Sequence, residues 1–159
     1  MARLRADAGG EGLASADLLI EAVAEDLAIK KTVLADAEGK IKPGAIMATN
    51  TSAIPLEDIG AALNDPARLI GMHFFNPVPV LPLVEVVYTA ASDGSFLARA
   101  MYVCGALKKL PVRCKSAPGF LVNRALLPYV FKAVEAMLNG ADPDKIDQAL
   151  VWFGMPMGP

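Results

Sequence analysis

The sequence predicts an α/β fold, in which a mostly parallel sheet has helices on both faces and an all-α region begins after it. Three observations support this class. Short continuous apolar runs alternate with longer segments of helical periodicity. Only one pair of apolar runs lacks a helical segment between its members. After residue 117 the strand-like runs stop and two helical segments follow. Alternating strands and helices are typical of an open, largely parallel sheet.

The first predicted strand and helix lie near the N-terminus. Residues 16–23 form a short continuous apolar run, which is typical of a strand covered on both faces. Residues 25–40 follow with the spacing of an amphipathic helix, and Gly39 is placed to end it. The apolar positions of this helix are Leu27, Val33, Leu34 and Ala37.

The other elements of the predicted sheet follow in order. Residues 44–50 predict a second buried strand. Pro55 suits the first turn of a helix over residues 55–64, because its fixed φ is tolerated there. The elements after it are strands at residues 67–75 and 81–89, a helix at 93–110 and a short strand at 111–115.

The character of the chain changes near Ala117, where we expect a domain boundary between residues 1–116 and 117–159. Residues 120–140 predict a long helix that Pro128 should kink or break. A second helix covers residues 142–155. Its expected cap is Asp142, and Pro143 takes its first position. These helices predict the start of an all-α domain.

Composition excludes several classes of protein. The 159 residues are 54% apolar and 20% charged, so the chain can bury a sizeable core. A formal net charge of −2 excludes the basic footprint of a nucleic-acid binder. No apolar run reaches the roughly 20 residues that span a bilayer, and the N-terminus has no apolar signal segment. We therefore expect a cytoplasmic protein with no membrane span.

The two cysteines, Cys104 and Cys114, suggest no disulfide framework, and their spacing matches no metal motif. We expect two reduced, buried thiols and no metal site.

His73 is the only histidine, and it stands where the third predicted strand gives way to a proline-rich turn. Ligands of open α/β sheets gather at the carboxyl ends of strands. Glu85 lies at the centre of the next apolar run, on one face with Leu83 and Val87. A carboxylate there is costly unless it is paired, so we expect His73 as its partner in an acid–base dyad. The alternative is a histidine with a purely structural role in the core.

Two polar features accompany this pair. Residues 49–52, with the sequence TNTS, end the second predicted strand, where they favour either a polar ligand or ordinary turn chemistry. Asn123 interrupts an apolar helical stretch just after the domain boundary. It either faces a cleft or bonds to a nearby loop.

Glu25 and Lys30 lie at the start of the first predicted helix. A capped helix with solvated charges is the more common outcome for such residues, and a ligand site is the alternative. The segment GGEGLAS at residues 9–15 does not predict a dinucleotide-binding loop, because no strand precedes it and the third glycine of G-x-G-x-x-G is missing.

Together these motifs resemble the L-3-hydroxyacyl-CoA dehydrogenase family. The stretches NTS, GMHFFNPVP, LVEVV, PGFLVNR and PMGP occur in that order and at the family's spacing, from about Ala16 to Pro159. The resemblance implies a partial Rossmann-type domain followed by the first helices of a truncated helical domain that serves substrate binding and dimerisation. The ending VWFGMPMGP most resembles the bacterial multifunctional alpha subunits of fatty-acid oxidation.

The resemblance also implies roles for particular residues. It makes His73 the catalytic base and Glu85 its orienting partner, with Ser52 and Asn123 bonding the substrate. The NAD site would be lined by Glu25, Lys30, Ser52 and Asn76, with backbone from Val23 and Ala24.

The implied activity is NAD-dependent oxidation of L-3-hydroxyacyl-CoA in fatty-acid β-oxidation. The implied partners are the acyl-CoA substrate, further copies in a homo-oligomer and a thiolase subunit. The family's glycine loop would lie upstream of Met1 and most of its helical domain beyond Pro159, so we expect an internal fragment. Two alternatives stay open: a self-associating fragment without catalysis, and an unrelated Rossmann-type binding module.

Overall fold

The computed structural model describes residues 4–159. The chain divides into two compact units, Met1–Phe120 and Leu121–Pro159. The division falls a few residues after the predicted boundary near Ala117.

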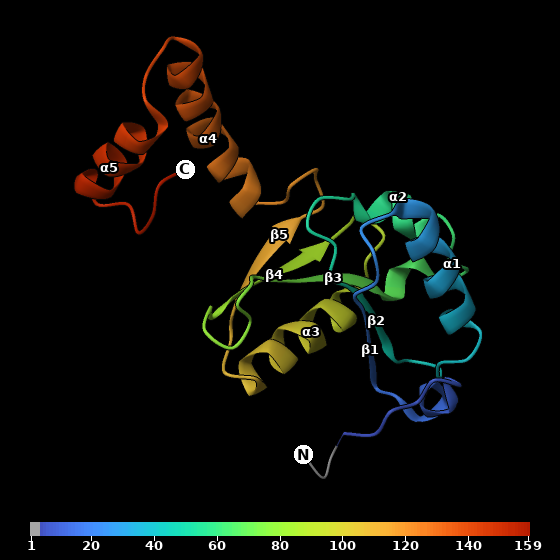
Figure 1. The fold of residues 1–159 in the computed structure, drawn as a ribbon. Coiled ribbons are helices and arrows are strands. Elements are labelled where there is room, and N and C mark those ends of the chain that lie inside the picture. The colour runs from blue at the N-terminus through green and yellow to red at the C-terminus, as the bar shows by residue number, and fades with distance from the viewer. Residues whose placement is uncertain (1–3) are drawn as a thin grey trace. The chain divides into compact units, whose positions relative to one another are not determined.

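Unit 1 contains a five-stranded sheet in the order β1-β2-β3-β4-β5 (Figure 1). Its strands are β1 Leu18–Glu21, β2 Ile46–Thr49, β3 Leu69–Phe74, β4 Leu83–Tyr88 and β5 Leu110–Lys115. Every neighbouring pair is parallel except β3 and β4, which are antiparallel. The predicted mostly parallel α/β sheet is therefore confirmed, and the reversal lies between the two runs that no helix separates.

The helices of unit 1 cover both faces of the sheet. Helices α1 Leu27–Glu38 and α2 Leu56–Gly60 lie on one face, and α3 Gly94–Ala106 lies on the other (Figure 1). Two short 3-10 helices, Glu11–Ser15 and Pro66–Arg68, complete the unit. The first of them contains most of the GGEGLAS segment, and no strand occurs among the described residues before it.

Two apolar clusters fill the space between the sheet and its helices. The α1–α2 side includes Met47, Leu56 and Val87, and the α3 side includes Ile70 and Val86. Val86 and Val87 are adjacent in sequence but lie in different clusters, because successive side chains of a strand point to opposite faces. Glu85 therefore shares the α1–α2 side with Val87, as the alternation predicts.

Strand β1 differs from its prediction. It was expected to be covered on both faces, yet Ile20 is 41% exposed. The cause is the placement of α3, which packs against β3, β4 and β5. Strand β1 lies at the opposite edge of the five described strands. The expectation of two-sided cover is therefore wrong for this strand and right for β2, which is buried throughout.

Helix α1 also differs in the face that it buries. Asp26 caps its N-terminus by accepting a hydrogen bond from the Ile29 amide at 2.9 Å, and Gly39 is its C-terminal cap. The buried positions are Lys30, Leu34 and Ala37. Val33, expected on the apolar face, is 38% exposed. Lys30 thus takes a buried position on this helix, whereas the apolar pattern predicted Val33 to be buried.

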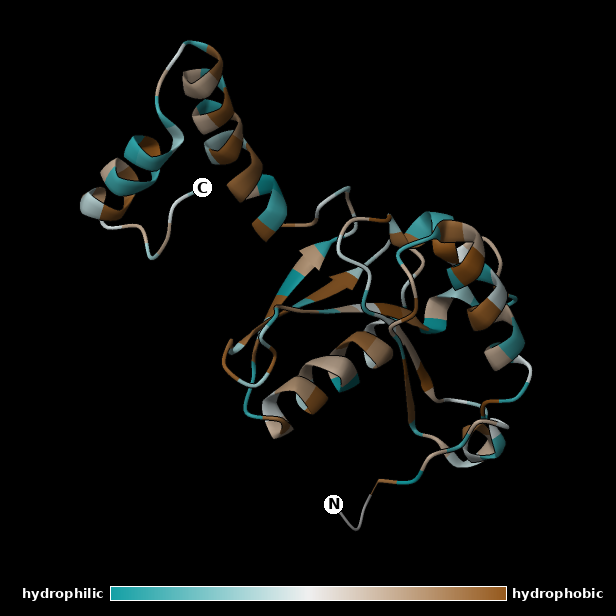
Figure 2. Cartoon of the chain, in the orientation of Figure 1, coloured by the Kyte–Doolittle hydropathy of each residue, from teal (hydrophilic) through white to brown (hydrophobic). Residues whose placement is uncertain are grey.

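Unit 2 consists of α4 Val122–Leu138 and α5 Pro143–Phe153. Asp142 caps α5 by accepting hydrogen bonds from the amides of Asp144 and Lys145, and Pro143 lies in its first turn, as predicted. Helix α4 continues through Pro128, so of the two expected outcomes, a kink or a break, the break does not occur. Figure 2 shows apolar residues along both helices. The large exposed ones include Leu127, Phe131, Leu138, Trp152 and Phe153.

Two further expectations concern the cysteines and the membrane. Cys104 is a buried free thiol, as expected, and burial raises its pKa. Cys114 is only half-buried, because the outer strand β5 leaves it partly accessible. Among the described residues, no helix combines the length and the apolar character that a membrane span requires.

Candidate functional site

The first part of the site is the pair His73 and Glu85. These residues are directly opposite each other on the antiparallel strands β3 and β4. His73 Nδ1 lies 2.6 Å from Glu85 Oε2, and both side chains are almost completely buried. The predicted contact is confirmed. A hydrogen-bonded partner offsets much of the cost of a carboxylate at the centre of a sheet.

Aromatic rings surround the imidazole of His73. Its ring centroid lies 4.5 Å from that of Phe75 and 5.9 Å from that of Phe120. Phe120 is buried at 2% exposure and has a positive φ of 46°. These rings exclude water from one side of the pair, and a lower local dielectric strengthens the attraction between an imidazolium and a carboxylate.

Gly71 makes room beside the pair. A Cβ atom at this position would lie 2.7 Å from the Cβ of Val87, its cross-strand partner. The strands could not keep this separation with any larger residue. Gly71 therefore permits the close approach of β3 and β4 that also aligns His73 with Glu85.

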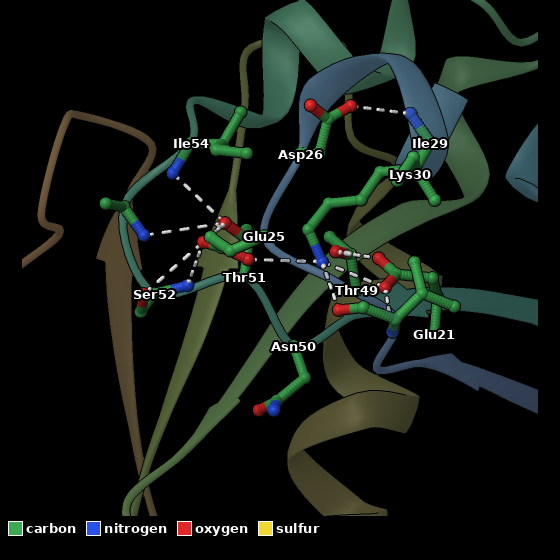
Figure 3. Close-up of polar contacts among 12 residues, drawn as sticks. Glu21, Glu25, Asp26, Ile29, Lys30, Thr49, Asn50, Thr51, Ser52 and Ile54 are labelled. Atoms are coloured by element: carbon green, nitrogen blue, oxygen red, sulfur yellow. Dashed lines mark hydrogen bonds and ion pairs between the residues drawn. The ribbon is translucent and has the colours of Figure 1, made fainter. Parts of the chain in front are cut away.

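The second part of the site is a buried charge cluster at the carboxyl end of β1, formed by Glu21, Glu25 and Lys30 (Figure 3). Lys30 Nζ lies 2.9 Å from Glu21 Oε1 and 3.2 Å from Glu25 Oε2. It also contacts the Val23 carbonyl at 3.5 Å. Lys30 is 1% exposed, so the expectation of solvated charges is wrong for it. An ammonium has three donors, and these three acceptors match them.

Glu25 joins this cluster to the residues after β2. Its Oε1 atom accepts hydrogen bonds from the Thr51 hydroxyl at 2.5 Å and the Ser52 amide at 2.9 Å (Figure 3). Burial raises the pKa of Glu25, but the hydrogen bonds from Thr51, Ser52 and Lys30 outweigh it and hold the pKa below its ordinary value. Glu25 is nevertheless 41% exposed, so its carboxylate remains accessible from solvent.

Asn50 connects the two parts of the site. Its Oδ1 atom accepts a hydrogen bond from the Phe74 amide at 2.9 Å, so the end of β2 is tied to the residue after His73. Thr51, fully buried, also accepts a hydrogen bond from the Ile54 amide at 3.0 Å. The TNTS segment thus combines turn chemistry with contacts to neighbouring strands.

The other predicted site residues lie in three places. Val23 and Ala24 lie in the exposed loop after β1, where the Val23 amide donates to Glu21 Oε1 at 2.7 Å. Asn76 is exposed beyond the end of β3, and its bond to Pro77 is cis. Asn123 is half-buried in the first turn of α4, in unit 2.

Sequence reasoning missed Glu21, which accepts from Lys30, from the Val23 amide and, through Oε2, from the Thr49 hydroxyl at 2.6 Å. The sequence contained an indication of this role, because Glu21 lies at the end of an apolar run, much as Glu85 lies within one. A carboxylate in such a position needs a buried partner. In residues 4–159, no group of three His, Cys, Asp or Glu side chains is placed to hold a metal ion.

Comparison with known proteins decides the family. Residues 1–117 match the model of the 3-hydroxyacyl-CoA dehydrogenase NAD binding domain, and residues 119–159 match that of the C-terminal domain of the same dehydrogenases. The chain belongs to the 3-hydroxyacyl-CoA dehydrogenase family. The cofactor named for the domain of residues 1–117 is NAD.

Relatives in this family include two proteins named fatty acid oxidation complex subunit alpha. The one from Vibrio cholerae is 38% identical over 159 residues and the one from Acinetobacter baylyi 41% over 160 residues. Each match covers the whole of this chain and 22% of the relative. The chain therefore spans about a fifth of the length of these relatives.

Solved structures of the family show the same fold. The (S)-3-hydroxybutyryl-CoA dehydrogenase of Ralstonia eutropha has a TM-score of 0.95 at 34% identity, covering 99% of this chain and 56% of that one. The 3-hydroxybutyryl-CoA dehydrogenase of Escherichia coli has a TM-score of 0.89 at 42% identity, covering 94% and 32%. These likenesses confirm the Rossmann-type sheet and the start of the helical region.

Proposed function

We propose that this chain carries the catalytic centre of an oxidoreductase of fatty-acid β-oxidation, which oxidises L-3-hydroxyacyl-CoA to 3-oxoacyl-CoA with NAD. The observation that carries the proposal is the buried 2.6 Å contact between His73 and Glu85. Oxidation of an alcohol needs a base for the hydroxyl proton, and this pair has the geometry of an oriented base.

In this mechanism Glu85 accepts a hydrogen bond from Nδ1–H of His73, which fixes the tautomer and leaves Nε2 unprotonated. Nε2 then takes the proton of the C3 hydroxyl. Glu85 stabilises the imidazolium that results, and the rings of Phe75 and Phe120 limit its exposure to water. A positioned general base of this kind contributes about 10²–10⁴ in rate.

The NAD cofactor, when bound, accepts the hydride from C3. The chain's donor set fits the nicotinamide half of such a group. The accessible carboxylate of Glu25 and the half-buried Ser52 suit ribose hydroxyls, and Asn76 with the backbone of Val23 and Ala24 adds exposed polar groups. Lys30 is too buried to meet a ligand directly, so we assign it the role of holding Glu25.

For the substrate, we propose that Ser52 and Asn123 bond the acyl-CoA near its 3-hydroxyl and thioester. Residues 1–116 would then provide the NAD-binding residues and the catalytic base. Residues 117–159 would form the start of the helical domain for substrate binding and dimerisation. Further partners in this proposal are copies of the chain in a homo-oligomer and a thiolase subunit. We also propose the cytoplasm as the location.

A second candidate is a self-associating fragment that keeps these residues without catalysis. The observation that favours it is exposed apolar surface, including Ile20, Val23 and Ile29 of unit 1. The loop between β1 and α1 also lacks the glycines that let backbone amides approach a pyrophosphate. We expect this chain alone to bind NAD only in the millimolar range, corresponding to about −4 kcal/mol, and to associate with itself.

Calorimetry with NAD and light scattering on the chain alone test this second candidate. Micromolar NAD binding by a monomer would contradict it.

The catalytic proposal is tested in a hybrid in which this chain replaces the matching segment of the Vibrio cholerae subunit. His73→Gln should lower turnover about 10²–10⁴-fold and leave NADH affinity unchanged. Glu85→Gln should act in the same direction. The control is Asn64→Ala, whose side chain bonds Glu38 away from the dyad and should leave turnover unchanged. Turnover of His73→Gln within about twofold of the parent, against that expected range, would refute the assignment of the base.

A further inference from the structure

The geometry points to Glu21 as a positioning residue for the cofactor site, acting through Lys30 on the carboxylate of Glu25. This inference rests on the proposed function, which places Glu25 in contact with NAD. Glu21 itself is 3% exposed and cannot meet a ligand. Its effect would therefore reach the cofactor only through the residues that it holds.

Three hydrogen bonds anchor the carboxylate of Glu21. Oε1 accepts from the Val23 amide at 2.7 Å and from Lys30 Nζ at 2.9 Å, while Oε2 accepts from the Thr49 hydroxyl at 2.6 Å. These contacts reach the loop after β1, helix α1 and strand β2 at once. Because three different elements hold this carboxylate, its position in unit 1 is restricted.

Lys30 links the position of Glu25 to that of Glu21. Lys30 bridges the two carboxylates, with its ammonium 2.9 Å from Glu21 and 3.2 Å from Glu25. The two carboxylates and one ammonium sum to one negative charge. Without the charge of Glu21, the buried ammonium would have Glu25 as its one anionic partner in the cluster, and we expect it to draw Glu25 inward.

The position of Glu25 in turn affects Ser52. Glu25 Oε1 receives hydrogen bonds from the Ser52 amide at 2.9 Å and the Ser52 hydroxyl at 3.3 Å. An inward shift of Glu25 would lengthen these bonds and disturb Glu25 and Ser52, two of the side chains that the proposed function gives to NAD. Buried Glu21 thus determines the position of the accessible Glu25 carboxylate, although Glu21 itself does not contact the ligand.

The substitution Glu21→Gln isolates this effect, because the amide keeps the size of the side chain and one oxygen for Val23 and Lys30. In the hybrid described above, NADH affinity measured by fluorescence titration should fall about tenfold. KM for NAD should rise by a similar factor, while KM for the acyl-CoA stays constant. A matched control is Glu38→Gln, a carboxylate at the C-terminal end of α1 that accepts hydrogen bonds from Asn64 and Asp65. It should leave NADH affinity unchanged.

A double-mutant cycle separates positioning from general damage. In a Glu25→Gln background, Glu21→Gln should change NADH affinity less than twofold, because its route to the cofactor is already gone. Equal losses in both backgrounds would overturn the inference, as would unchanged affinity in Glu21→Gln alone. If Glu25→Gln itself leaves NADH affinity unchanged, the cofactor site of the proposed function fails instead. Thermal melts of each variant distinguish these results from unfolding.

Discussion

Replacing Lys30 by Met gives the sharpest stability test of the buried charge cluster. Met keeps most of the aliphatic stem that packs in α1 and removes the ammonium. Glu21, whose side chain has no exposed surface, would then keep its charge without a cation. It would retain only the bonds from the Val23 amide and the Thr49 hydroxyl.

Removing one member of a buried pair costs about 3–5 kcal/mol. Total unfolding free energies of domains are about 5–15 kcal/mol, so we expect Lys30→Met to remove a large part of the stability of unit 1. The exposed pair of Lys40 and Asp36 provides the control, since its side chains are 51% and 63% exposed. Lys40→Met should change stability by about 0.5 kcal/mol or less.

Urea unfolding followed by far-UV circular dichroism and by amide exchange in β2 and β3 measures the loss. Trp152 lies in unit 2, so its fluorescence is the wrong probe for this cluster. The double variant Glu21→Gln with Lys30→Met removes both charges and should be more stable than Lys30→Met alone. If Lys30→Met costs no more than Lys40→Met, or if the double variant is the less stable of the two, the cluster is not held by charge.

Three other outcomes are expected. Gly71→Ala should destabilise unit 1 by about 1–3 kcal/mol in urea unfolding, because its new Cβ would lie 2.7 Å from the Cβ of Val87; an unchanged free energy of unfolding would contradict this clash. Burial raises the pKa of the Glu38 carboxylate, but the hydrogen bonds that it accepts from Asn64 and Asp65 outweigh this effect and lower the pKa below 4.5. Its stabilisation is complete above that pH and lost below its folded pKa, so the melting temperatures of wild type and Glu38→Gln should converge on acidification. Reductive methylation of the folded chain should modify exposed Lys40 and spare Lys30; equal labelling would contradict its burial.

Sequence reasoning succeeded where a short-range pattern and a physical cost pointed to the same partner. A carboxylate at the centre of an apolar run required a buried partner, and His73 was the one candidate just before a chain reversal. The antiparallel register of β3 and β4 then placed them face to face. The cap Asp142 was predicted correctly because it acts within its own helix.

The same reasoning failed where partners come from different elements. Lys30 was expected in solvent because charges at the start of a capped helix are commonly solvated, whereas its position is decided by Glu21 on β1. Cover over β1 could not be read from its apolar run, because it depends on which strands α3 reaches.

The reversal between β3 and β4 has a consequence for the order in which the site assembles. His73 and Glu85 are separated by 12 residues along the chain, whereas Glu25 and Ser52 are separated by 27. Loop-closure entropy favours the shorter separation by about 0.7 kcal/mol, from (3/2)RT ln of the ratio. The antiparallel pair also needs no intervening helix, while β1 and β2 must wait for α1 to dock. We expect pulse-labelled amide exchange during refolding to show protection of Met72 and Val86 before Ser52, so that the contact between His73 and Glu85 forms on a hairpin before Glu25 meets Ser52.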